Sequence, residues 1–140
     1  MKVILDANIW ISYLLTPAEG RTITQIVEAC FGDDIELLVP PELIDEIVEN
    51  VQDSPYLRTR IVREALHQLI EQLALVAMIP KPLTEKLSTF SRDPDDDYLV
   101  AYGLVHEVDY LVTGDRHLLV LQQVDHVKIV EPRAFLALFR

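Results

Sequence analysis

The stretch KVILDAN, residues 2–8, decides the fold class of this 140-residue chain. It begins with a short apolar run, Lys2 to Leu5, rich in branched side chains, which is typical of a buried strand. Asp6 ends the run, and an apolar segment over residues 8–15 follows until Thr16-Pro17 stops it. The stretch therefore predicts a strand that passes directly into a short helix, with an acid at the junction.

The same alternation continues along the chain. Further strands are predicted over residues 35–39, 76–79, 110–112 and 127–130, and further helices over residues 23–31, 43–51, 61–73, 93–107, 117–121 and 132–139. Strands that alternate with helices predict an α/β fold, with a parallel sheet covered by helices on both faces. Because no linker or repeat interrupts the pattern, we expect one domain over residues 1–140.

Composition narrows the class of protein. Half of the residues are hydrophobic, which favours a folded globular chain over disorder. The apolar runs are too short to span a bilayer, and Asp6 and Asn8 interrupt any signal-peptide core. Cys30 is the only cysteine, so no intrachain disulfide forms. We therefore expect a cytoplasmic protein without a membrane partner.

The net charge of −11 argues against a nucleic-acid partner, because proteins that bind phosphate backbones are usually basic. Bound metal ions would offset part of this charge. An enzyme could also bind nucleic acid through only a small rim of basic residues. The candidate RNA-binding residues are Arg58, Arg60, Arg63 and Arg92, and their alternative role is ordinary solvated surface.

Three acids stand at strand exits or helix entries: Asp6, Asp97 and Asp115. The carboxyl ends of parallel strands meet at one edge of a sheet, where ligands bind in open α/β folds. Carboxylates gathered there repel one another unless a cation lies between them. Their oxygens suit Mg²⁺ or Mn²⁺, so the sequence predicts a divalent-metal site, with Asn8 and Thr113 as supporting residues.

Each of these acids also has a structural explanation. Asp6 and Asp115 could cap the helices that follow them, as could Asn8. Asp97 is harder to explain in this way, because an acid in the first turn of a buried helix needs a partner. On the helix over residues 43–51, periodicity does not choose between Asp45 and Glu46 as a fourth acid.

With these residues in view, the chain resembles the PIN-domain family, and is similar to the VapC-type toxins of toxin–antitoxin systems. The resemblance is carried by residues 5–8, 41–47, 93–101 and 111–115. It implies a three-layer α/β/α fold whose five-stranded parallel sheet has the order 3-2-1-4-5. It also implies a Mg²⁺- or Mn²⁺-dependent endoribonuclease, often homodimeric and paired with an antitoxin.

The same resemblance assigns the catalytic positions. They are Asp6, Glu46, Asp97 and Asp115, with Asn8 and Thr113 supporting them; Asp6, Asp97 and Asp115 are the metal ligands. Many relatives carry a further acid at the position of His117. The resemblance therefore does not decide between one and two metal ions. The nearly all-apolar helix after Asp97 suggests a buried dimer contact.

Three functions compete. The first is metal-assisted RNA cleavage, in which a metal-bound water attacks the phosphodiester. The second is a catalytically inactive PIN-like binding or regulatory subunit, suggested by the acidic balance and His117. The third is phosphate-monoester transfer through Asp6 as in haloacid-dehalogenase-like phosphatases, which is disfavoured because Asn8 stands where those enzymes place a second acid.

Overall fold

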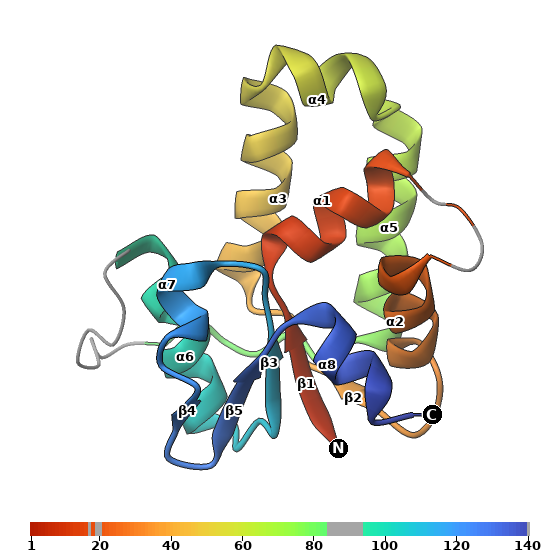
Figure 1. Ribbon diagram of the computed structural model, residues 1–140. Coiled ribbons are helices and arrows are strands. Elements are labelled where there is room, and N and C mark those ends of the chain that lie inside the picture. The colour runs from red at the N-terminus through yellow and green to blue at the C-terminus, as the bar shows by residue number, and fades with distance from the viewer. Residues whose placement is uncertain (17, 19–20, 84–93, 140) are drawn as a thin grey trace.

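Figure 1 shows the computed structural model of residues 1–140, which describes all of them except residues 17, 19–20, 84–93 and 140. For residues 94–97 only the backbone is described. The strands are β1 (Lys2–Leu5), β2 (Glu36–Leu37), β3 (Tyr110–Val112), β4 (Gln123–Val124) and β5 (Val127–Val130). The helices are α1 (Ala7–Leu15), α2 (Thr22–Cys30), α3 (Pro41–Asp53), α4 (Pro55–Arg60), α5 (Arg63–Val76), α6 (Pro94–Val105), α7 (Arg116–Leu119) and α8 (Pro132–Ala137).

The sheet has the order β2-β1-β3-β5-β4, and its first four strands run parallel. Helices cover both faces (Figure 1). On one face α6 packs on β5, where Gly103 brings the helix backbone against Val127. On the other face the Phe135 ring of α8 lies 5.8 Å from the ring of Tyr110 in β3. The predicted three-layer α/β/α fold is therefore confirmed.

The edges of the sheet differ from the expected order 3-2-1-4-5. The segment expected as a third strand, residues 76–79, forms only a single parallel bridge between Met78 and Leu38 beyond β2. Helix α5 continues through Val76, and Pro80 soon follows without an N–H for a ladder, so the segment is too short to pair further. The fifth strand is instead β4, which pairs antiparallel with β5.

The core holds the junction of β1 and α1 in place. Trp10, the only tryptophan, is fully buried and donates its indole N–H to the Leu5 carbonyl at 3.1 Å. The bond joins the first turn of α1 to the last residue of β1. Asp6, which lies between them, is therefore attached to rigid elements on both sides.

The apolar face of α6 is covered within one chain. Leu99, Val100 and Tyr102 are all fully buried, although the sequence suggested a dimer contact there. A second subunit is not needed to cover them, so this helix gives no argument for a homodimer. Among the helices of the described residues, none is both long and apolar enough to cross a bilayer.

Candidate metal centre

Two neighbouring strands bring Asp6 and Thr113 together. β1 and β3 are in parallel register, with Leu5 opposite Val112, and the Asp6 amide donates to the Val112 carbonyl at 3.0 Å. The next residue of each strand therefore lies at the carboxyl edge of the sheet. There the Thr113 hydroxyl donates to Asp6 Oδ2 at 2.6 Å, and both side chains are buried.

The same hydroxyl connects this pair to the third residue of the site. Thr113 Oγ1 accepts a 3.0 Å hydrogen bond from the backbone amide of Asp115. The half-buried Asp115 carboxylate accepts from the amide of His117 at 2.8 Å through Oδ1, which caps α7. The capping role considered from the sequence therefore holds for Asp115, in addition to its place beside Thr113.

For Asp6 the capping explanation fails. It occupies the N-cap position of α1, yet within the described residues its side chain makes no capping hydrogen bond there. Its carboxylate instead turns toward Thr113. Asp6 is therefore a buried acid held by a neutral hydroxyl, at the edge where ligands bind in open α/β sheets.

The electrostatics favour a cation at this point. Burial raises the pKa of Asp6 above its usual value, and the nearby charge of Asp115 raises it further. The Thr113 hydroxyl and the neighbouring amides of Ala7 and Asn8 oppose the rise, although those amides make no hydrogen bond of normal geometry with the carboxylate. A bound cation would relieve both the desolvation and the repulsion, so these residues fit a hard divalent ion.

Helix α3 presents a further acid. Glu46 is half-buried, and its Oε1 accepts a 2.6 Å hydrogen bond from the hydroxyl of Tyr98 in α6. Asp45, its neighbour, is exposed. The contact between α6 and α3 thus distinguishes Glu46 from Asp45, which helical periodicity could not do.

The last predicted ligand, Asp97, and the supporting residue Asn8 are described less fully. The Asp97 side chain lies outside the described residues, but its backbone lies in the first part of α6, directly before Tyr98. Asn8 is exposed in the first turn of α1. Among the side chains that the structure describes, which exclude Asp97, no three of the His, Cys, Asp and Glu type are grouped to hold a metal.

A comparison with protein-family models matches residues 2–117 to the PIN domain. The chain belongs to the PIN-domain family. Proteins of this family are in general metal-dependent nucleases, and the match includes every predicted acid, namely Asp6, Glu46, Asp97 and Asp115. No curated protein matches the chain at a significant level of similarity.

Three of the four predicted RNA-contacting arginines of this PIN domain lie on α4 and at the start of α5, away from Glu46. Arg58 and Arg60 are exposed on α4, beyond the carboxyl end of α3, and Arg63 is exposed at the start of α5 (Figure 1). From Glu46 to the end of α3 at Asp53 the rise is about 10 Å, and α4 begins two residues later. The Arg60 guanidinium lies 3.6 Å above the ring of Tyr56, and its Nη1 donates to the Tyr56 carbonyl at 3.1 Å. Arg92 lies outside the described residues.

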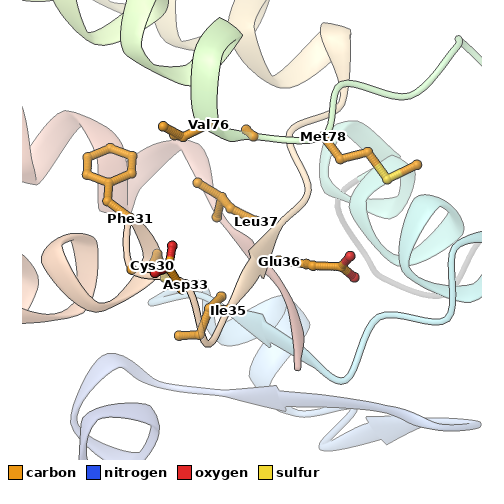
Figure 2. A pocket seen from close by; sticks show the side chains of 10 residues that line it. Cys30, Phe31, Asp33, Ile35, Glu36, Leu37, Val76 and Met78 are labelled. Atoms are coloured by element: carbon orange, nitrogen blue, oxygen red, sulfur yellow. The ribbon is translucent and has the colours of Figure 1, made fainter.

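A hollow of about 510 Å³ lies elsewhere on this PIN domain (Figure 2). The end of α2, β2 and the segment Val76 to Met78 line it. Glu36 in its wall is in register with Lys2, at the amino end of β1, whereas Asp6 follows the carboxyl end. At about 3.3 Å per residue the level of Glu36 is some 13 Å from Asp6 along the strand. Asp6, Thr113 and Asp115 do not line the hollow, so it is separate from the candidate metal centre.

Tyr98 was not predicted as a site residue, and the structure places its hydroxyl against Glu46. A signal was present in the spacing. Tyr98 and Tyr102 are four residues apart on one helix, as are Glu42 and Glu46 on the other. Residues four apart lie on the same face of a helix, so each pair could face the other helix.

Proposed function

We propose that this chain is a Mg²⁺- or Mn²⁺-dependent endoribonuclease. Asp6, Asp97 and Asp115 bind the divalent ion, and Glu46 completes the site directly or through a water molecule. The observation that supports this most strongly is the buried Asp6 carboxylate, held by Thr113 next to Asp115 at the carboxyl ends of two adjacent parallel strands.

The chemistry follows from the character of these groups. A bound divalent ion supplies a water of lowered pKa and neutralises the charge that develops on the phosphate oxygens. The chain's own residues hold that ion and set its position. Buried Asp6 brings negative charge to a place of low dielectric, where its attraction for a cation is strong. No side chain is needed as a covalent nucleophile.

RNA as the substrate and the role of a toxin come from the resemblance to VapC-type proteins. In this proposal Arg58, Arg60, Arg63 and Arg92 contact the RNA backbone, which the net charge of −11 would otherwise repel. An antitoxin partner and a homodimer belong to the same proposal, as does a single catalytic domain over residues 1–140.

The test is cleavage of a labelled single-stranded RNA by the purified chain. Cleavage should require Mg²⁺ or Mn²⁺ and stop with EDTA. Asp6→Asn and Asp97→Asn should each lower the rate at least about 100-fold, because loss of a ligand costs more than loss of a residue behind it.

The chain supplies a matched control for the fourth acid. Glu46→Gln should also lower the rate strongly, whereas Asp45→Asn, one position away and exposed, should leave it unchanged. Undiminished cleavage by Asp6→Asn would remove this mechanism.

A second candidate is a PIN-like binding or regulatory subunit that no longer cleaves RNA. It is motivated by His117, which is exposed where many relatives carry another acid. Calorimetric titration with Mn²⁺ separates the two candidates. A nuclease should bind the ion in a manner that depends on Asp6 and Asp115, and an inactive scaffold should show no such binding.

A further inference from the structure

Two tyrosine–glutamate pairs join α6 to α3. The Tyr98 hydroxyl donates to Glu46 Oε1 at 2.6 Å, and the Tyr102 hydroxyl lies 2.7 and 2.9 Å from the two carboxylate oxygens of Glu42. The tyrosines ascend α6 while their partners descend α3, so the two helices run antiparallel at this contact. The pairs are therefore equivalent in chemistry and one helical turn apart.

The two pairs differ in what surrounds them. Tyr102 is fully buried, its hydroxyl also accepts from the Leu83 amide at 3.2 Å, and burial raises its pKa to about 12. Its partner Glu42 is an exposed residue with both oxygens close to the tyrosine hydroxyl. This pair joins the two helices one turn farther along α6 from Asp97 than the first pair.

The other pair includes the residue next to a proposed metal ligand. Tyr98 follows Asp97 directly in the chain, so one turn of α6 carries both a proposed ligand and the hydroxyl that contacts a second acid. Glu46 is half-buried, and a glutamate side chain has three rotatable bonds that metal binding must order. A donor that already holds one oxygen removes part of that cost.

We infer that Tyr98 is a positioning residue, which holds the Glu46 carboxylate in the orientation that completes the metal centre. This inference rests on the proposed function. Tyr98 acts on the metal centre through Glu46, whereas the equivalent pair of Tyr102 and Glu42 contributes to helix packing. Hydrogen-bond partners behind metal ligands typically change metal affinity 10- to 100-fold.

The test compares Tyr98→Phe with Tyr102→Phe. Each removes one hydroxyl, keeps the ring and breaks one tyrosine–glutamate bond between the same two helices. Mn²⁺ affinity is measured by calorimetry without RNA, and kcat and KM are measured with RNA. Tyr98→Phe should weaken Mn²⁺ binding about 10-fold and lower kcat with little change in KM. Tyr102→Phe should leave Mn²⁺ affinity unchanged.

A double variant shows whether Tyr98 acts through Glu46. In the background of Glu46→Gln, Tyr98→Phe should cause no further loss of Mn²⁺ affinity, because the residue that it positions is already altered. Three results would each overturn this inference and leave the proposed function standing. They are additive losses in the double variant, equal losses in the two tyrosine variants, and wild-type affinity in Tyr98→Phe. A wild-type chain that binds no Mn²⁺ would overturn the proposed function as well.

Discussion

The Thr113 hydroxyl donates a 2.6 Å hydrogen bond to the Asp6 carboxylate, between residues 107 positions apart in the chain. The bond is buried and lies where two parallel strands end side by side. Because Thr113 Oγ1 also accepts from the Asp115 amide, one hydroxyl sets the relative positions of two acids. The proposed metal centre depends on this arrangement.

Replacing Thr113 by valine should lower the free energy of unfolding by about 1–3 kcal/mol, because a buried carboxylate loses its donor and a backbone amide loses its acceptor. Thr113→Ser keeps the hydroxyl and should retain most of the stability. Urea unfolding in EDTA measures both. Equal stability of the valine and serine variants would show that the hydroxyl does not contribute.

The raised pKa of Asp6 predicts how stability varies with pH in metal-free protein. An acid whose pKa is higher in the folded state stabilises the fold fully below its usual value, here 3.8, and loses that contribution as pH rises through the folded-state value. Asp6→Asn does not titrate. Its melting temperature should therefore equal that of the wild type near pH 3 and exceed it increasingly toward pH 7.

Addition of Mg²⁺ at pH 7 should reverse this order, since the ion stabilises only the chain that keeps its carboxylate. Melting curves with EDTA and with Mg²⁺ make the comparison. A difference between the two proteins that does not change with pH would contradict the electrostatic account of Asp6.

Trp10→Phe should destabilise the junction of β1 and α1. The substitution removes the donor to the Leu5 carbonyl and leaves space in a fully buried site, at a cost of about 2–4 kcal/mol. Circular dichroism must follow the unfolding, because the chain has no other tryptophan. Unchanged stability would show that this contact does not anchor Asp6.

The arginines on α4 should affect RNA binding and not the chemical step. Replacing Arg58 and Arg60 by alanine should raise KM with kcat unchanged, and should reduce the salt dependence of RNA affinity by about 1.4 in the log–log slope. Arg133→Ala, at an exposed position of α8, is the control. An unchanged slope in the double variant would assign these two arginines to ordinary surface.

The central part of the fold was predictable from the sequence because its strands are short, branched apolar runs with an acid or a turn after them, as at residues 2–5 and 110–112. The edges were not. Val76 continues a helix although its neighbours resemble a strand, and β4 has only two residues with no apolar alternation. Edge pairing of this kind is decided by tertiary contacts.

The candidate site shows the same division. Acids at strand exits could be found because parallel strands bring their carboxyl ends together. The choice between Asp45 and Glu46 could not be made from the sequence pattern, because the two lie about 100° apart on a helix beside the same apolar stripe. The packing of Tyr98 against Glu46 supplies that distinction, and no pattern within α3 contains it.

Anomalous diffraction from crystals grown with Mn²⁺ tests the central claim most directly. We predict a manganese peak coordinated by oxygens of both Asp6 and Asp115, with Asp97 completing the ligands and Glu46 coordinated directly or through water. Crystals grown in saturating Mn²⁺ would contradict the account if they showed no manganese peak between Asp6 and Asp115. A peak there with the Asp97 and Glu46 side chains directed away from it would also contradict the account.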